Sequence, residues 1–275
     1  MAGTLYLVPT PIGNLGDISD RCRNTLAAAD FIAAEDTRVS IKLLNHLGVK
    51  KPLVSYHEHN KLESGPKILA RLQKGESCAL VTDAGCPAIS DPGEDLVRLC
   101  ADAGVPVCAI PGPCAAITAL SVSALPTGRF VFEGFLPTDK KQRNARLGVL
   151  LREERTAILY EAPHRLRETL AALAEALGAN RRISLCRELT KLHEEILRLT
   201  LGEAVAYFAE NEPRGEFVLV LEGAAPAAEV TTLEDAVALV EQLVANGLTK
   251  KDAVRQAARD LGFPKNALYD AVMRN

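Results

Sequence analysis

Two polar segments that follow short apolar runs contain residue types able to do chemistry. Glu35-Asp36-Thr37-Arg38 places two carboxylates beside a guanidinium, a combination that suits a binding or catalytic site. The same residues would also suit the start of a helix, where acidic side chains interact favourably with the helix dipole, and the residues alone favour this second interpretation. His57-Glu58-His59-Asn60 could bind a metal ion through its two histidines. Because no third group of ligands lies nearby, we predict a polar loop there and no metal site.

The rest of the chain is organised around a third segment, LVTDAGCPAISDPG, at residues 80–93. Asp83-Ala84-Gly85 follows an apolar run that predicts a buried strand, so it lies where the carboxyl end of a strand opens onto a crevice. A glycine there lets the backbone come close to a ligand. At the far end, Asp91 as N-cap with Pro92 and Glu94 predicts a capping box, which gives Asp91 a structural role. These residues fit either a ligand-binding turn or a plain strand-to-helix connection.

Strands that alternate with helices along most of the chain indicate an α/β fold class. The first half predicts a largely parallel sheet, and the second half predicts a more mixed sheet in which strands at 195–200 and 217–221 form a pair. The C-terminal residues fit either a helix-turn-helix or a set of small packing helices. We expect an α/β domain over 1–126, a second α/β domain over 127–224 and a helical extension over 225–275, with an Ala/Pro-rich linker at 223–229.

The composition argues against several classes of protein. The chain contains neither G-x-G-x-x-G nor G-x-x-x-x-G-K-[ST], so dinucleotide-binding and P-loop functions lose their main support. No apolar run is long enough to span a membrane. The 7 cysteines, an odd number without C-x-x-C spacing, are typical of reduced thiols and predict a cytoplasmic protein without disulfides or a zinc site. Aromatic residues make up 4% with no Trp, so base stacking is not expected to be the main binding device.

The net charge of −3 does not indicate nucleic-acid binding, but basic residues gather in two blocks. Residues 139–155 and 249–275 each contain six basic residues against three acidic ones. Such patches could bind a polyanion, although solvated helix faces carry similar clusters more often. The candidate residues for contacting a nucleic-acid backbone or another polyanion are Lys140, Lys141, Arg143, Arg146, Lys250, Lys251 and Arg255.

Several separated motifs in a fixed order carry a family resemblance. VPTPIGNLGD, TDAGCPAISDPG and IPGPCAA together resemble the tetrapyrrole-methylase superfamily. With EDTR, SYHEHN, YEAPHR and RELTKLHEE added, the chain resembles the ribosomal RNA small subunit methyltransferase I family from about Thr4 to Gly223, and its helical tail is also similar. Cys86 and Cys114 are small departures from the motifs that leave the assignment intact.

The resemblance implies that S-adenosylmethionine binds in a cleft between two α/β domains of a homodimer. It implies methyl transfer to the ribose 2′-oxygen of a cytidine in the decoding region of small-subunit (16S) rRNA, a reaction that requires no metal. Loops of the first domain and segments of the second would then contact the methyl donor. These residues are Pro11, Asp83, Ala84, Gly85, Cys86, Pro87, Ile89, Ser90, Pro111, Gly112, Cys114, Ala115, Leu159, Tyr160, Glu188, Leu189, Glu216 and Phe217.

Such a reaction needs the donor methyl in line with an attacking oxygen and benefits from a base near the hydroxyl. Glu35 or Asp36 could serve as that base, with Arg38 and Lys191 on rRNA phosphate. A tetrapyrrole methylase of the same fold is an alternative that the two basic blocks argue against. A non-catalytic ribosome-assembly RNA-binding factor is another, opposed by the intact donor loops. The full set of catalytic candidates is Asp17, Glu35, Asp36, Arg38, His57, Asn60 and Lys191.

Overall fold

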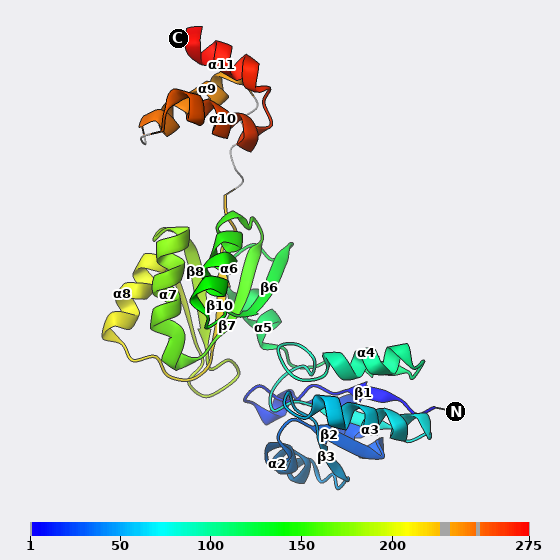
Figure 1. The fold of residues 1–275 in the computed structure, drawn as a ribbon. Helices are drawn as coiled ribbons and strands as arrows, with labels where there is room; N and C mark the ends of the chain where they lie inside the picture. Colours follow the sequence, from blue (N-terminus) through cyan, green and yellow to red (C-terminus); the bar gives the residue numbers. More distant parts are fainter. Residues whose placement is uncertain (1, 226–231, 246–247, 275) are drawn as a thin grey trace. The chain divides into compact units, whose positions relative to one another are not determined.

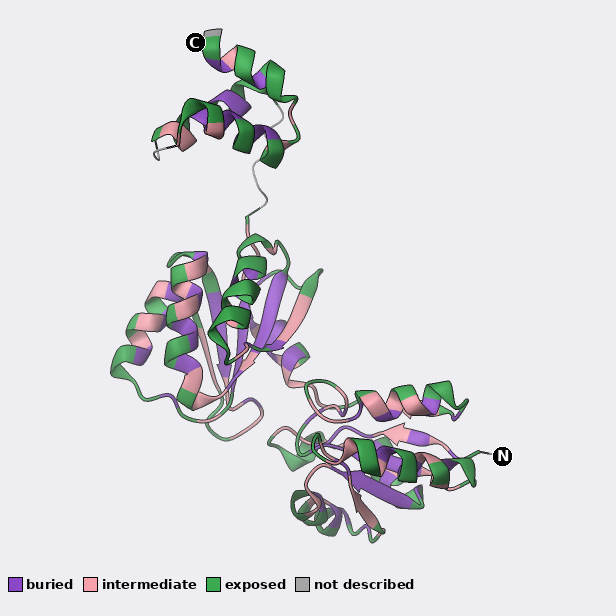
Figure 2. Ribbon diagram, in the orientation of Figure 1, coloured by how far each residue is buried: buried purple, intermediate pink, exposed green. Residues whose placement is uncertain are grey.

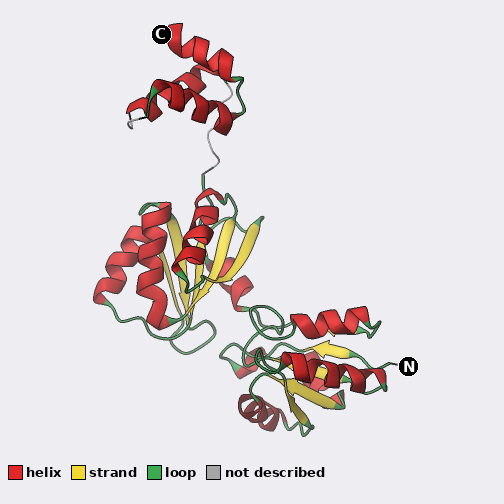
Figure 3. Ribbon diagram, viewed as in Figure 1, coloured by secondary structure: helices red, strands yellow, loops and turns green. Residues whose placement is uncertain are grey.

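The computed structural model describes residues 2–225, 232–245 and 248–274. The chain divides into two compact units, residues 1–223 and 224–275, and each is described by itself. The first unit contains two five-stranded sheets (Figures 1 and 3). Among the described helices, none is both long and apolar enough to cross a membrane.

The first sheet is parallel throughout, as the sequence predicts. Its strand order is β3-β2-β4-β1-β5, which gives β4 the central position. Because the carboxyl ends of parallel strands meet at one edge, the segments after β1, β2 and β4 lie near one another there. The strands are β1 (Leu5–Leu7), β2 (Phe31–Ala34), β3 (Leu53–Ser55), β4 (Cys78–Val81) and β5 (Val107–Ala109). The helices are η1 (Leu15–Asp17), α1 (Asp20–Ala28), α2 (Thr37–Leu47), α3 (Lys61–Gln73), α4 (Glu94–Asp102) and α5 (Ala115–Val122).

Helices cover both faces of the first sheet, and its inner strands β2 and β4 are fully buried (Figure 2). On one face, Leu26 of α1 and Leu44 of α2 pack against Ile32. On the other, Ile68 of α3 and Leu96 of α4 complete a second core. This part of the unit is a three-layer α/β/α arrangement.

The second sheet is mixed, with strand order β6-β7-β10-β8-β9. β6 runs parallel to β7, and the other pairs are antiparallel. The predicted pair of 195–200 with 217–221 is wrong, because β8 lies between β9 and β10 and bonds to both. β8 is almost fully buried and suits an inner position, whereas the half-exposed β9 suits an edge. The elements are β6 (Phe130–Phe135), α6 (Lys140–Arg152), β7 (Thr156–Glu161), α7 (Pro163–Leu177), β8 (Arg182–Arg187), β9 (Glu195–Thr200), α8 (Leu201–Glu210) and β10 (Phe217–Leu221).

The two faces of the second sheet pack against different helices. Leu219 lies in the core formed with α6, α7 and α8, whereas its neighbours Val218 and Val220 lie in a core with Ala116 and Leu120 of α5. This is the period-two alternation expected of a strand. α5 therefore follows the first sheet in sequence but packs on the second.

The second unit is a three-helix cluster made of α9 (Leu233–Ala245), α10 (Lys250–Leu261) and α11 (Lys265–Arg274). Val240, Val254 and Leu268 contribute one residue from each helix to its core. The Thr249 side chain caps α10. Of the expected linker at 223–229, residues 226–229 lie outside the described residues.

Candidate active site

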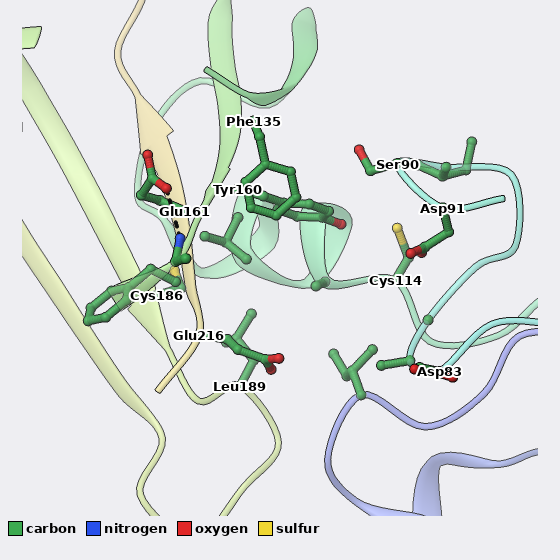
Figure 4. Close-up of a pocket in the computed structure, with 18 of the residues that line it drawn as sticks. Asp83, Ser90, Asp91, Cys114, Phe135, Tyr160, Glu161, Cys186, Leu189 and Glu216 are labelled. Carbon is green, nitrogen blue, oxygen red and sulfur yellow. Dashed lines mark hydrogen bonds between the residues drawn. The ribbon is translucent and has the colours of Figure 1, made fainter. Parts of the chain in front are cut away.

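A cavity of about 540 Å³ opens between the carboxyl end of the first sheet and the second sheet, inside the first unit. Its volume is typical of a small-molecule ligand site. Asp83 and Asp91 approach it from loops of the first sheet, and Tyr160 and Glu216 approach it from the second (Figure 4).

Paired backbone hydrogen bonds join the loop after β4 to the loop after β1. The amide of Thr10 donates to the carbonyl of Gly85 at 2.9 Å, and the amide of Gly85 donates back at 3.0 Å. The Thr10 hydroxyl also donates to the Thr82 carbonyl at 3.1 Å. Gly85 has φ of 86°, a conformation that residues with a Cβ rarely adopt. These bonds hold the backbone of both loops at the cavity wall.

The structural role predicted for Asp91 is wrong. α4 begins at Glu94, its N-cap is Gly93, and no side chain caps it. In the preceding loop, Ala88 and Ser90 have φ of 68° and 60°, so the backbone turns sharply before the helix. Asp91 lines the cavity and does not cap the helix (Figure 4).

Three carboxylates from the first sheet, those of Glu35, Asp83 and Asp91, face the cavity. The Thr82 hydroxyl donates to Oε2 of Glu35 at 2.8 Å. Burial, together with the negative charge of Glu35, raises the pKa of Asp91 to about 6. Burial also raises the pKa of Asp83. In the described part of the chain, none of the three carboxylates forms an ion pair.

Lys191 is the one Lys or Arg among the described lining residues, and two carboxylates hold it. Its Nζ atom lies 2.9 Å from Oε1 of Glu188 and 3.0 Å from Oε2 of Glu216. Burial alone would lower the pKa of Lys191, but these hydrogen bonds raise it overall. Glu188 and Thr190 in the same loop have φ of 51° and 66°. Backbone strain of this kind is commonly found at functional sites.

Aromatic rings form the wall that the second sheet contributes. Tyr160 stacks edge-on against Phe135, with ring centroids 5.7 Å apart, and against Phe132 at 5.1 Å. Burial raises the pKa of Tyr160 to about 12, so its hydroxyl keeps its proton at neutral pH. Phe135 remains 51% exposed beside the cavity and could contact a planar ligand.

Asp36 and Arg38, two of the predicted catalytic residues, bind each other at the start of α2. Oδ1 of Asp36 accepts the Arg38 amide at 2.8 Å, which confirms the helix-cap interpretation of this segment. The Arg38 guanidinium holds the pKa of Asp36 at about 2. Neither residue lines the cavity, whereas the adjacent Glu35 does.

His57, Asn60 and Asp17 also lie outside the cavity lining. The Asn60 side chain accepts the His57 amide at 2.8 Å and donates to the Ser55 carbonyl at 3.1 Å, so it stabilises the loop between β3 and α3. Asp17 ends η1. Across the described residues, no group of three His, Cys, Asp or Glu side chains could hold a metal ion.

Most of the predicted donor-binding residues line the cavity. Those outside the lining are Pro11, Pro87, Pro111, Gly112 and Leu159. Leu159 packs in the core beneath α6 and α7, since alternation along β7 sends it to the face opposite Tyr160. The predicted residues in the lining are Asp83, Ala84, Gly85, Cys86, Ile89, Ser90, Cys114, Ala115, Tyr160, Glu188, Leu189, Glu216 and Phe217.

Sequence reasoning missed several lining residues. Phe135 ends an alternating aromatic strand, FVFEGF, a pattern that could have drawn attention to it. Glu161 is buried, and its carboxylate is occupied by the Thr169 hydroxyl at 2.5 Å and the Ala162 amide at 2.8 Å. The lining residues not predicted as donor contacts or catalytic groups are Ile12, Asp91, Phe135, Glu161, Ala162, Pro163, Cys186 and Val218.

The candidate RNA-binding residues differ in how far their charges are already neutralised. Lys140 and Lys141 are exposed at the start of α6, and Lys250 and Lys251 are exposed on α10. The remaining three are ion-paired: Arg143 with Glu168 at 2.6 Å, Arg146 with Glu133, and Arg255 with Asp252 at 2.6 Å.

Residues 4–205 match the family of tetrapyrrole (corrin/porphyrin) methylases. The chain is 50% identical to the ribosomal RNA small subunit methyltransferase I of Synechocystis, covering 97% of this chain and 96% of the relative. It is 48% identical to the protein of that name from Bacillus subtilis, covering 98% and 94%. This chain belongs to the ribosomal RNA small subunit methyltransferase I family. Members of this family are methyltransferases, and the resemblance seen in the sequence is confirmed.

Solved structures share the methyltransferase fold at low sequence identity. The uroporphyrin-III C-methyltransferase of Thermus thermophilus, complexed with S-adenosylhomocysteine, aligns with TM-score 0.56 at 20% identity, covering 80% of this chain and 97% of that one. A diphthine synthase aligns with TM-score 0.60 at 15% identity, covering 80% and 90%. These likenesses confirm the predicted tetrapyrrole-methylase fold.

Proposed function

We propose that this protein transfers the methyl group of S-adenosylmethionine to the ribose 2′-oxygen of a cytidine in the decoding region of small-subunit rRNA. The observation that carries the proposal is the identity of 44–50% over nearly the whole chain to relatives named ribosomal RNA small subunit methyltransferase I. An rRNA substrate would also give the protein a cytoplasmic location, in agreement with its cysteine pattern.

The cavity supports S-adenosylmethionine as the donor through its size and charge. Its volume of about 540 Å³ suits a ligand of that size. Its described lining carries six carboxylates against the single cation Lys191, and a negative surface favours a ligand with a positively charged sulfonium. When bound, the donor supplies an activated methyl group. The six carboxylates are Glu35, Asp83, Asp91, Glu161, Glu188 and Glu216.

Glu35 is the general base that we favour for deprotonating the ribose hydroxyl. Its carboxylate lines the cavity and accepts a hydrogen bond from Thr82, which orients it. Asp36 suits the role less well, because Arg38 and the α2 amides occupy its carboxylate. Lys191 suits a positioning role better than a phosphate contact, because Glu188 and Glu216 neutralise it.

The rRNA backbone would be bound by the exposed lysines of α6 and α10, since phosphate contacts need cations that no carboxylate already neutralises. Lys140, Lys141, Lys250 and Lys251 are exposed and form no ion pair with any residue that the structure describes. We further propose that the protein acts as a homodimer and that methyl transfer needs no metal, because a sulfonium methyl is already activated.

A methyl-transfer assay with tritiated S-adenosylmethionine tests the function. Purified protein is offered small ribosomal subunits, naked rRNA and uroporphyrinogen III. If the small subunit becomes labelled, its rRNA is hydrolysed with alkali. Label that remains in an alkali-resistant dinucleotide would identify a 2′-O-methyl group and its position. Label in uroporphyrinogen alone would overturn the rRNA function and leave the methyltransferase assignment standing.

A further inference from the structure

The carboxylates around the cavity fall into two groups with different electrostatic surroundings. On the second-sheet side, Glu188 and Glu216 pair with Lys191, and Glu161 accepts hydrogen bonds from Thr169 and Ala162. On the first-sheet side, the carboxylates form no ion pair in the described part of the chain, and Arg38, which acts on Asp83 from outside the lining, is itself paired with Asp36. The cavity therefore has one neutralised side and one side with excess negative charge. The first-sheet group consists of Glu35, Asp83 and Asp91.

The Thr82 hydroxyl cannot supply hydrogen bonds to all three of these carboxylates. It donates to Oε2 of Glu35 at 2.8 Å and also lowers the pKa of Asp91, but a hydroxyl has one proton and cannot donate it fully to both carboxylates. Carboxylates gathered in a partly buried site without a cation raise the energy of the free protein. A cationic ligand would relieve this cost, and a neutral one would not.

The two ligands that this site must distinguish differ mainly in charge. S-adenosylmethionine carries a sulfonium, and the product S-adenosylhomocysteine carries an uncharged thioether at the same position. Contacts to the shared adenosine and amino-acid parts bind both equally well. Only a charge close to the sulfur position separates them, since electrostatic energy falls with distance.

Resting on the proposed use of S-adenosylmethionine, we propose that Asp91, supported by Glu35 and Asp83, makes the cavity selective for the sulfonium donor over the thioether product. Asp91 is then a specificity-determining residue that favours product release after each methyl transfer. Its loop, rather than serving as a helix cap, positions this charge.

The titration of Asp91 agrees with this role. The titratable groups around it are Glu35, Asp83, Cys86, Cys114 and Tyr160, and none of them carries positive charge. A carboxyl with a pKa of about 6 is ionised at pH 8 and largely neutral at pH 5. The preference for the donor should therefore fall as the pH falls, without any mutation.

Calorimetric titration of three ligands tests the proposal. S-adenosylmethionine and sinefungin, whose amine replaces the sulfonium with another positive charge, are compared with neutral S-adenosylhomocysteine. We expect Asp91→Asn to raise the Kd of both cations about tenfold and that of S-adenosylhomocysteine by less than about threefold. Asp102→Asn, which removes an exposed charge at the end of α4, should change none of the three.

Equal weakening of all three ligands, or no weakening at all, would overturn the proposal. Binding of S-adenosylhomocysteine by Asp91→Asn reports that the variant is folded. If it does not fold, the wild-type ratio of the two Kd values at pH 8 and pH 5 decides, and a ratio independent of pH contradicts the proposal. Wild-type protein that binds none of the ligands would instead refute the proposed function.

Discussion

The aliphatic stem of Lys191 lies directly over Gly13, so that the loop after β8 meets the loop after β1. A Cβ atom built on Gly13 would lie 2.9 Å from Cε of Lys191 and closer still to its Cγ. Gly13 also has φ of 151°, which disfavours any other residue. A glycine at this position is what allows Lys191 to reach Glu188 and Glu216.

Replacing Gly13 with alanine should displace Lys191 and break its ion pairs at the cavity. We expect a loss of about 1–3 kcal/mol in unfolding free energy. Methyl transfer should fall at least about tenfold, because small misplacements at a site cost rate. Gly104→Ala is the control, since Gly104 has φ of 67° but nothing within 4 Å of an added Cβ. Equal activity loss in the two variants would mean that backbone strain, and not contact with Lys191, is responsible.

Glu35 and Asp36 are adjacent in sequence but should differ in the effect of their substitution. Glu35→Gln should lower kcat by about 10²–10⁴-fold while S-adenosylhomocysteine still binds, because a general base would be lost. Asp36→Asn should mainly weaken the α2 cap and lower the Tm slightly, with little change in kcat. Single-turnover rates and thermal melts of both variants separate these outcomes. A fully active Glu35→Gln would remove Glu35 from the catalytic list.

The raised pKa of Asp91 predicts a stability effect with a definite sign. The folded-state pKa of about 6 lies above the ordinary value of 3.8, so ionised Asp91 destabilises the fold above pH 6 and costs nothing below about pH 4. Asp91→Asn should therefore raise the Tm at pH 7.5 by about 2–4 °C, after allowance for partial solvent exposure, and leave it unchanged near pH 4. Scanning calorimetry at the two pH values is the measurement. A lower Tm at pH 7.5 would show that the carboxylate is stabilising.

The exposed lysines at the start of α6 should contribute to rRNA affinity and not to donor affinity. Lys140→Ala combined with Lys141→Ala should raise the KM for small subunits and reduce the salt dependence of binding by about one to two ion equivalents. The Kd of S-adenosylmethionine should stay the same. Arg143→Ala offers a contrast, because breaking its ion pair with Glu168 should lower stability as well. An unchanged KM in the double variant would exclude this surface from RNA binding.

Local patterns in the sequence were sufficient to predict much of the fold. Helix caps are one such pattern, since Ser19, Asp36, Asp139 and Thr249 each accept a backbone amide at the start of a helix. These caps depend on residues within one helical turn. The parallel first sheet likewise follows from the alternation of strands and helices.

Non-local geometry explains what the sequence did not predict. The residue types around Asp91 match a capping box. Positive φ angles at Ala88 and Ser90 turn the chain away from that geometry, and the residue types do not predict these angles. The position of β8 between β9 and β10 is a matter of strand order, which local patterns do not contain. The wrong placement of Leu159 at the cavity could have been avoided from the sequence. Side chains alternate along a strand, so only one of Leu159 and Tyr160 can face the cavity.

The packing of α5 has a mechanical consequence. Its body is attached to the second sheet through Ala116 and Leu120, while Cys114 and Ala115 at its start form part of the cavity wall. Just before it, the carbonyl of Pro113 accepts the Cys86 thiol at 3.2 Å from the first-sheet side. Any hinge motion between the two sheets would bend the chain next to the ligand. A bound donor, in contact with both sheets, would therefore restrict that motion and fix the angle between the sheets.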